Sequence, residues 1–460
     1  MTLYKVGPWR RSIVWFRRDL RLADHPALSE AVAGAQTVLP LFVLDERLLT
    51  TAAPARAWFL RGSMAELDRS LRERGSGLLV HAGDPASIVP RVAREVDAEV
   101  VLASADVTPF ARGRDAAVAA ALEADGRRLL LREGVTLVDP GDVRTGAGAP
   151  YTVFTPFWRK LQAVPRRAIL PTPAAVATPP ELLRESALPV TDPSPHPDLP
   201  SPGEAAARER LERWVAGGVA SYPSGRERLD GSGSSHLGAD LHFGTLSPLQ
   251  VESAAGAADA DAEAFTRQLA WRELYHHHLH HQATKPRPVS ALTRAFRRES
   301  DDPDAVAAWR DGRTGIPTVD AAMRQLATTG WMSNRARLVT ASFLTRHLLM
   351  DWRIGERHFL AHLVDGDVAN NRGGWEWSAG VGLDAQPWFR ILNPVRQGQR
   401  FDADGAWVRR WIPELEFVPN RYVHAPWEFP HPVPGYPAPI VDLAEGRSRA
   451  LAAFKAATAR

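Results

Sequence analysis

The sequence predicts two folded regions of different class: an N-terminal α/β domain built on a doubly wound, Rossmann-like parallel sheet, and a C-terminal all-helical domain. Three observations support this prediction. Short apolar runs alternate with helical patterns over residues 12–140, a proline-dense stretch follows, and the pattern is mostly helical from residue 203 onward. We therefore expect domains over residues 11–140 and 203–460, joined by an interdomain linker over residues 141–202.

Five apolar runs indicate buried parallel strands: SIVWF (12–16), VLPLFVL (38–44), GLLVH (77–81), EVVLA (99–103) and RLLL (128–131). Helical patterns over residues 56–74, 86–96 and 112–125 lie between them, an alternation typical of a doubly wound sheet. The loop after the first strand, RRDLRLADHP, is rich in arginine. It has no G-x-G-x-x-G pattern, and no Walker A pattern occurs, so a dinucleotide bound there in the Rossmann manner is not supported.

The second half of the chain begins after a segment that resists regular structure. Residues 165–202 hold eleven prolines, and proline at this density blocks helix and sheet interiors. Beyond it, helical patterns cover residues 204–218, 262–281, 318–328, 335–350 and 355–364, and no strand-like alternation is convincing. The predicted helical domain is large enough to enclose a cofactor.

Composition excludes several classes of chemistry. The 460 residues contain no cysteine, which excludes disulfides, thiolate zinc sites, cysteine nucleophiles and cysteine-ligated iron–sulfur clusters. No apolar run reaches the roughly 18–20 residues of a membrane span, and the basic N-terminus has an apolar core too short for a secretory signal. We expect a cytoplasmic protein without membrane contact. A net charge of +3 permits a localised anion-binding patch.

The segment DGSGSSHLGADLHFGTLSP (230–248) places glycine, serine and histidine ahead of a helix expected to begin near Ala239. Backbone amides and hydroxyls at a helix start suit a phosphate group. A flexible loop with an ordinary N-cap is the alternative for this segment taken alone.

The segment RQLAWRELYHHHLHH (267–281) carries Gln268, Trp271 and Tyr275 on one helical face. An amide and an indole on one face suit a base edge or a flat aromatic ligand. The histidine pairs 276/280 and 277/281 have a spacing that can bind metal. Because no acidic third ligand is placed to help, a solvated helix face is favoured and no metal site is predicted.

A third constellation lies between residues 334 and 377. Asn334, Arg335, Arg337 and Leu338 fall at the start of a predicted helix, where arginines oppose the helix dipole and therefore call for an anionic partner. Asp365 or Asp367 is the expected partner of Arg337. The acids, amides, glycines and indoles of DGDVANNRGGWEWSAG suit a cofactor site better than a core, and the double glycine at 373–374 indicates a tight turn.

These blocks together resemble the DNA photolyase/cryptochrome family, and specifically the class I cyclobutane pyrimidine dimer photolyases. VWFRRDLRLADHPAL, WRELY, GIPTVDAAMRQLATTGWMSNRARLVTASFL, DWRIGERHF and DGDVANNRGGWEWSAGVGLDAQPWFRILNP match the family's signature blocks in order, over nearly the whole chain. The resemblance implies a carbon–carbon lyase that repairs the dimer by electron transfer from excited reduced FAD. The alternatives are a cryptochrome-type blue-light receptor and a FAD-containing DNA-binding protein without repair activity.

The resemblance also implies which residues hold FAD. A loop before the helical core contacts the flavin's phosphates, an arginine–aspartate ion pair and a second acid lie beside the isoalloxazine, and an asparagine faces its N5 atom and favours repair over signalling. In this chain those residues are Tyr222, Ser234, Ser235, His236, Leu237, Gly238, Arg337, Asp365, Asp367 and Asn371. His236 stands where many members have arginine and Gly238 where they have serine, so backbone amides are expected to carry more of the phosphate binding.

For the lesion pocket, the resemblance implies that Trp271 and Trp377 pack on the flipped dimer, with Asn334 and Gln268 as polar contacts. Gln268 stands where many members have glutamate, and an amide is a doubtful general acid. Asn334 together with Leu338 excludes the histidine pair of (6-4) photolyases. The DNA-contacting residues implied are Arg226, Arg335, Leu338 and Arg390, and the expected partner is damaged DNA, single- or double-stranded, bound by a monomer.

Two further expectations concern electrons and light. Trp375 and Trp352 match the first two members of the family's tryptophan relay, but Arg298 and Glu299 occupy the place of the third, so photoreduction should use another exit or be slow. A second, antenna chromophore is expected in the α/β domain. Pro109 and Phe110 replace the amide–acid pair of folate-binding members, which favours a deazaflavin over folate.

Overall fold

The computed structural model describes residues 9–50, 53–183, 188, 193–258, 262–282, 291–384 and 390–458. The chain divides into two compact units, which are treated separately below. The first comprises Met1–Tyr151, Thr155–Val219 and Ser235–Lys285, and the second comprises Thr152–Phe154, Ala220–Ser234 and Pro286–Arg460. Among the described residues, no helix combines the length and the apolar character that crossing a bilayer requires.

The first unit is built on a five-stranded parallel sheet, as predicted. Its strands are β1 (Trp9–Phe16), β2 (Ala35–Leu44), β3 (Leu79–Ala82), β4 (Val100–Ser104) and β5 (Arg128–Arg132), in the order β3-β2-β1-β4-β5. All five expected strands are present. The expectation that each is buried is wrong for β5, whose residues are exposed or half-buried because it lies at the edge of the sheet with β4 as its one partner.

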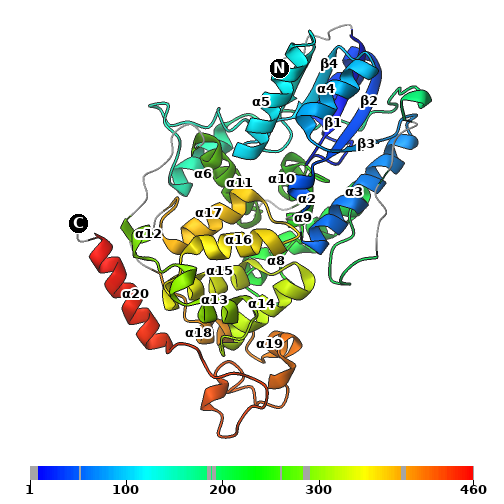
Figure 1. The fold of residues 1–460 in the computed structure, drawn as a ribbon. Helices are drawn as coiled ribbons and strands as arrows, with labels where there is room; N and C mark the ends of the chain where they lie inside the picture. The colour runs from blue at the N-terminus through cyan, green and yellow to red at the C-terminus, as the bar shows by residue number, and fades with distance from the viewer. Residues whose placement is uncertain are drawn as a thin grey trace. The chain divides into compact units, whose positions relative to one another are not determined.

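Helices cover the sheet because its strands are apolar on both faces. Ile13 and Trp15 pack in one core with residues of α4 (Pro85–Glu95) and α5 (Pro109–Glu123), while Val14 and Phe16, pointing the other way, are equally buried. Figure 1 shows α4 and α5 running beside the strands. Helices α2 (Glu46–Leu49) and α3 (Pro54–Arg72) follow β2.

The helices of this unit that the sequence analysis did not predict include the one that follows β1. Helix α1 (Pro26–Gly34) begins with a proline in its first turn, and the His25 ring accepts a hydrogen bond from the Leu28 amide at 3.1 Å. Helices α4 and α5 start in the same way, with a polar cap followed by proline. Proline at the first helical position is favoured because its missing N–H would be unsatisfied there anyway. The dipeptide His25–Pro26 was therefore a readable start signal.

The proline-rich segment lies partly along the first unit. The Val38 amide donates to the Ala177 carbonyl at 2.9 Å, and the Val176 amide donates to the Arg74 carbonyl at 2.9 Å. The predicted linker over residues 141–202 also contains α6 (Phe154–Ala163) and a 3₁₀ turn at Pro180–Leu183. Residues 184–187 and 189–192 of the predicted connector lie outside the described residues. The unit is completed by α7 (Glu204–Arg213), a π-helical turn at Trp214–Gly218, α9 (Gly238–Phe243), α10 (Pro248–Ala258) and α11 (Glu263–Gln282).

The second unit is helical, as predicted, and no strand element occurs among the residues described after 203. The predicted helix over 335–350 corresponds to α15 (Asn334–Ser342) followed by a π-helical turn at Phe343–His347. The core of the second unit includes Trp309, Met323, Phe343 and Trp375, all nearly or fully buried. The helices are α8 (Val219–Gly225), α12 (Ala291–Ala295), α13 (Pro303–Arg310), α14 (Pro317–Thr329), α15 (Asn334–Ser342), α16 (Trp352–His362), α17 (Val368–Ala379), α18 (Pro394–Phe401), α19 (Ala406–Trp411) and α20 (Leu443–Thr458).

Candidate functional site

The histidine run of α11 is buried, so its expected role as a solvated helix face is wrong. His276, His277 and His278 are almost fully enclosed, and Arg272 and Glu273 are buried with them. Each charged or polar group has a partner nearby, which removes the cost of burying it. The His277 Nδ1 lies 2.9 Å from the Pro140 carbonyl, and its Nε2 accepts from the Tyr151 amide at 3.2 Å. No metal-binding group of histidine, aspartate or glutamate side chains occurs in the described part of the chain.

Replacing His277 with glutamine should make the protein less sensitive to acid. Burial lowers the pKa of His277 from 6.5 to about 4. Because the unfolded imidazole takes up a proton below about pH 6.5 and the folded one does not, the free energy of unfolding falls with decreasing pH, by about 1.4 kcal/mol per pH unit. Urea unfolding of both proteins between pH 8 and 4 measures this slope. A variant curve parallel to that of the native chain would contradict the assignment.

Three predicted contact residues share the less buried side of α11. Gln268, Trp271 and Tyr275 are each half-buried, whereas Leu269, Ala270 and the neighbouring charged pair are enclosed. The rings of Trp271 and Tyr275 lie 5.7 Å apart, centroid to centroid. The sequence prediction of one common face is therefore confirmed, and that face presents an amide and two aromatic rings.

The loop before α9 has the shape of an anion site within the first unit. The helix begins at Gly238, one residue from the predicted start, and His236 adopts the left-handed conformation with φ of 54°. Ser235 and His236 line a cavity of about 380 Å³ together with Arg210, Arg213 and Trp214. Leu237 is buried beneath the loop. The arginines of α7 place positive charge beside the loop that holds His236.

One of these arginines is already engaged. Arg210 donates to Asp240 at 2.5 Å, and Thr245 donates to the same carboxyl group at 2.9 Å. Burial nevertheless raises the pKa of Asp240 to about 6, against the opposing effect of Arg210. Arg213, by contrast, is an exposed side chain on the same cavity wall. It is therefore the arginine better placed to meet an external anion.

In the second unit, the start of α15 and the start of α17 are joined by an ion pair. Arg337 Nη2 lies 3.0 and 2.9 Å from the two oxygens of Asp365, so Asp365 is the partner of the two acids considered. Asp367 instead caps α17, accepting a hydrogen bond from the Asn370 amide at 2.8 Å. An arginine that opposes its own helix dipole is thus neutralised by a specific carboxylate.

Helix α17 carries the predicted amide and indoles, and it corrects one expectation. The segment 373–374 is not a tight turn, because both glycines lie inside the helix. Asn371 donates to the Glu356 carbonyl at 2.9 Å, which fixes the orientation of its amide. Trp375 is buried, whereas Trp377 is half-buried. Two residues separate them by about 200° around a helix, so they leave it in opposite directions.

The indole environment of the predicted relay includes a residue that the sequence did not single out. The Trp375 ring lies 6.1 Å from that of Trp309 and 4.9 Å from that of Phe359, centroid to centroid. Trp352, the second predicted relay member, is buried and has the guanidinium of Arg353 over its ring at 4.7 Å. Trp309 is separated from Trp375 by many residues in sequence, which is why no local pattern indicated it.

Arginines gather around one acid at the start of α15. Arg335 forms an ion pair with Glu227 and lies over the Phe401 ring at 4.8 Å, and Arg226 contacts the same Glu227 at 3.2 Å. Arg400 lies over Phe401 at 5.0 Å. Burial and the charges of Arg226 and Arg400 lower the pKa of Arg335. Arg226 and Arg335 share the Glu227 carboxylate, and Arg400 lies over the same ring as Arg335. This excess of cations leaves a net positive surface suited to a polyanion.

This cluster borders a cleft of about 720 Å³ in the second unit, lined in part by Glu227, Arg228, Arg400 and Trp407. The other predicted contact residues are scattered over the unit. Asn334 and Arg390 are exposed, and Leu338 is half-buried. Tyr222 is half-buried on α8, and burial raises the pKa of its hydroxyl. Ser234 is half-buried and is the last residue of the segment Ala220–Ser234 of this unit.

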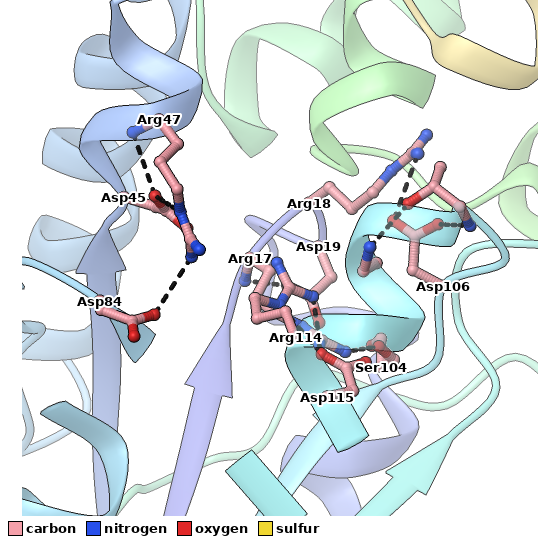
Figure 2. A network of polar contacts seen from close by, with 12 residues as sticks. Arg17, Arg18, Asp19, Asp45, Arg47, Asp84, Ser104, Asp106, Arg114 and Asp115 are labelled. Atoms are coloured by element: carbon pink, nitrogen blue, oxygen red, sulfur yellow. Dashed lines mark hydrogen bonds and ion pairs between the residues drawn. The ribbon is translucent and has the colours of Figure 1, made fainter. Parts of the chain in front are cut away.

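The sequence analysis missed a polar network where the strands of the first unit end (Figure 2). Arg17, directly after β1, donates to Asp115 at 2.5 Å and to the Ser104 carbonyl. Arg114 contacts the same Asp115 at 2.9 Å. Both guanidinium groups lie over the Trp15 ring, at 4.7 and 4.9 Å. Burial, reinforced by the charge of Arg17, lowers the pKa of Arg114.

A second arm of the network follows β2. Arg47 pairs with Asp45 at 2.7 Å and with Asp84 at 3.1 Å, as Figure 2 shows, and lies 5.2 Å from the centre of the Phe110 ring. In the sheet, β1 lies between β2 and β4, so the strand order reverses direction at β1. Open α/β sheets bind ligands at such a switch point, beyond the carboxyl ends of the strands. The charged residues Arg17 and Asp45, which directly follow β1 and β2, were the signal that could have found this site.

Comparison with known proteins defines the class to which this fold and these residues belong. Residues 12–179 match the family described as DNA photolyase, and residues 265–456 match the FAD binding domain of DNA photolyase. The deoxyribodipyrimidine photo-lyase of Streptomyces griseus is 43% identical over 452 residues, covering 95% of this chain and 98% of the relative. The chain belongs to the DNA photolyase family.

Solved structures agree on the fold. A bacterial class III photolyase from Agrobacterium tumefaciens matches with a TM-score of 0.89 and 36% identity, covering 100% of this chain and 99% of the other. A cryptochrome from Synechocystis matches with a TM-score of 0.85 and 27% identity, covering 98% of this chain and 100% of the other. Since both kinds of protein share the fold, the activity has to be argued from individual residues.

Proposed function

We propose that this chain is a light-driven DNA repair enzyme that splits cyclobutane pyrimidine dimers; its Streptomyces griseus relative is named deoxyribodipyrimidine photo-lyase. The observation that carries the proposal is helix α17. It places Asn371, the asparagine typical of repair enzymes, together with Trp375 and Trp377, directly after the Asp367 cap. Figure 1 shows α17 beside α16 in the helical part of the chain. A photoreceptor needs no lesion-packing indole such as Trp377.

The proposed cofactor is FAD. In the second unit its contacts would be Tyr222, Ser234, Arg337, Asp365, Asp367 and Asn371, and in the first unit Ser235, His236, Leu237 and Gly238. Two features of α17 suit a flat ligand. The buried Trp377 Nε1 has no hydrogen-bond acceptor among the described residues, and a Cβ added to Gly374 would meet no atom within 4 Å. Arg213 supplies the positive charge that phosphates favour, and His236 lines the same cavity.

When bound, reduced FAD would supply the light-driven electron-transfer chemistry that opens the dimer. The protein's part is to bind and orient. Trp271 and Trp377 offer aromatic surfaces for the extruded dimer, which cannot be reached inside the base stack. Asn334 and Gln268 offer amide hydrogen bonds. Because an amide does not release a proton, Gln268 positions the dimer without acting as an acid.

The proposed DNA contacts rest on the arginines of the second unit. Arg226 and Arg335 share Glu227, so an incoming phosphate would find two cations held by one carboxylate. Arg390 and Leu338 complete the proposed set. Phosphate contacts position a duplex without reading its sequence, and binding should therefore weaken as salt concentration rises. A monomer that accepts single- or double-stranded DNA is the form we propose.

We also propose an antenna chromophore in a domain over residues 11–140, with a linker over 141–202 and the helical domain over 203–460. The switch-point network supports a flat, anionic ligand. Arg17 and Arg114 lie over Trp15, and Phe110, which is 39% exposed, lies near Arg47 and Arg114. Pro109 and Phe110 lack the amide and acid of folate-binding members, so a deazaflavin is the chromophore proposed.

The test is direct. The protein, with its FAD chemically reduced, is incubated with dimer-bearing single- and double-stranded DNA under blue light, and the remaining dimers are counted. Light-dependent loss of dimers is expected, with no loss in the dark. If dimers persist under light although FAD is bound and damaged DNA is retained, the chain is a binding protein or a receptor and the repair function is excluded.

A further inference from the structure

We infer that the Glu227 carboxylate occupies the place of a DNA phosphate in the DNA-free protein and thereby limits how tightly DNA of any sequence is held. The inference rests on the proposed function, because it takes Arg226 and Arg335 as phosphate contacts. A phosphate that binds both guanidinium groups has to displace Glu227 from them. When DNA leaves, the carboxylate returns, so Glu227 sets how long the protein stays on DNA.

Glu227 bridges the two arginines with separate oxygens. Its Oε1 lies 3.2 Å from the Nε of Arg226, and its Oε2 is paired with the Nη2 of Arg335. Guanidinium groups bind carboxylate and phosphate oxygens through the same fork of N–H donors, so the two anions compete for one position. The Glu227 side chain is 27% exposed and that of Arg226 is 40% exposed. The position that the carboxylate fills can therefore be reached from solvent.

Arg335 does not depend on Glu227 for its place. Its Nη1 donates to the Oε1 of Gln397 at 3.1 Å, and its guanidinium lies over the Phe401 ring at 4.8 Å. Both contacts come from α18, whereas Glu227 lies on the loop after α8. Without the carboxylate, Arg335 should remain anchored by the amide and the ring. Glu227 is thus better explained as a competitor for the arginines than as their support.

The balance of charge shows what neutralising Glu227 would do. Two guanidinium charges and one carboxylate charge leave a single positive charge on this group of residues. Arg400 adds another cation nearby, since burial and then the charges of Arg226 and Arg400 lower the pKa of Arg335. Loss of the carboxylate charge therefore raises the positive potential that a polyanion meets. One further neutralised phosphate steepens the slope of log affinity against log salt by about 0.9.

The loop that carries Glu227 is held by contacts in which this side chain takes no part. Gly225 and Gly233 cross so closely that a Cβ on Gly233 would overlap the Gly225 backbone. Between them, the Asp230 carboxyl group accepts hydrogen bonds from the amide and the hydroxyl of Ser232, at 3.0 and 2.9 Å. An amide in place of the Glu227 carboxylate should therefore leave the loop in its present conformation.

The functional consequence concerns release of the product. Repaired DNA offers the same phosphates as damaged DNA, and phosphate contacts do not depend on the bases. Differences in affinity among variants of one interface lie mostly in the dissociation rate. A carboxylate that reclaims the two arginines speeds the departure of repaired DNA. Glu227 therefore favours turnover over tight binding.

The experiment titrates a fluorescent undamaged duplex in the dark with the FAD-bound native chain and with Glu227→Gln, at several salt concentrations. The variant should bind several-fold more tightly, with a salt slope steeper by about 0.9, and stopped-flow measurements should show slower dissociation. A residue that merely positioned the arginines would give weaker binding and an unchanged or shallower slope. Equal or weaker binding by Glu227→Gln therefore overturns the inference.

Asp230→Asn is the matched control. It removes the same charge from the same loop, its amide oxygen can still accept from Ser232, and its partner Arg228 is outside the proposed set of DNA contacts. Its affinity and salt slope should stay close to those of the native chain. Equal tightening in both variants would assign the effect to net charge and overturn the inference.

Glu227→Asp keeps the charge on a shorter side chain and serves as the second variant. It should bind DNA with an affinity between those of the native chain and Glu227→Gln, because one carboxylate then reaches the two arginines less well. An affinity at or above that of Glu227→Gln contradicts the competition. Failure of the native chain to bind any DNA would instead count against the proposed function. Binding by the native chain without a gain in Glu227→Gln would count against this inference alone.

Discussion

Replacing Trp377 with alanine is expected to weaken binding to dimer-bearing DNA about thirty-fold while FAD remains bound. An aromatic ring stacked on a base contributes about 1–3 kcal/mol to binding, and about 1.4 kcal/mol corresponds to a factor of ten. Trp377 is half-buried on α17 and leaves the helix opposite to the buried Trp375. Its loss should therefore remove a ligand-facing ring without opening the core.

The measurement is a titration of damaged and undamaged DNA with each protein at fixed salt concentration, alongside the flavin absorbance of the purified variant. Trp377→Phe is the matched control, because it retains a ring and should keep most of the preference for damaged DNA. Undamaged DNA should bind both variants like the native chain, since its contacts are with phosphates. Equal affinity of Trp377→Ala and native protein for damaged DNA would refute the pocket assignment.

Replacing Gly355 with alanine is expected to destabilise the second unit by about 3 kcal/mol and to displace Trp375. Helix α16 passes so close to the Trp375 indole that a Cβ on Gly355 would overlap the six-membered part of the ring. Overpacking a dense core costs about 1–3 kcal/mol, occasionally more. The ring is almost fully buried, so it cannot move aside without disturbing Trp309 and Phe359, which it contacts.

Gly374→Ala provides the matched control on the same pair of helices. Its added methyl would meet no protein atom within 4 Å, and alanine is favoured over glycine inside a helix by about 1 kcal/mol. Denaturant unfolding of the flavin-free proteins should place the two alanine variants on opposite sides of the native chain, and tryptophan fluorescence should report the displaced indole only in Gly355→Ala. If Gly355→Ala were as stable as the native protein, α16 and α17 would be able to move apart at little cost in the free energy of unfolding, and the prediction would be wrong.

Much of the fold could be predicted because its determinants are local. Apolar runs of strand length located all five strands, and the arginine that opposes its helix dipole indicated the Arg337–Asp365 pair. Helix α17 was not predicted, since two consecutive glycines disfavour a helix interior. The Asp367 cap and the left-handed Gly380 that closes the helix outweigh them.

Other errors and omissions have non-local causes. His276 and His277 look polar in sequence, yet α11 buries them, with His277 bonded to Pro140 and Tyr151, segments distant in the chain. Trp309 comes into contact with Trp375 through the packing of α13 and α17 in one core. No local sequence pattern predicts a contact between two residues so far apart in the chain. Predicting it requires the arrangement of the helices themselves.

The edge strand β5 bears on whether this protein self-associates at high concentration. A strand with one open side offers unpaired backbone groups to a second molecule. β5 reads RLLLR, with Leu131 40% exposed between half-exposed neighbours. Arginines stand at both of its ends. Arg132 is paired with Glu30, whereas Arg128 is exposed, so pairing a second strand with β5 would bring a charged side chain into the contact. The apolar centre that anchors β5 to its sheet is thus flanked by residues that oppose self-association and aggregation.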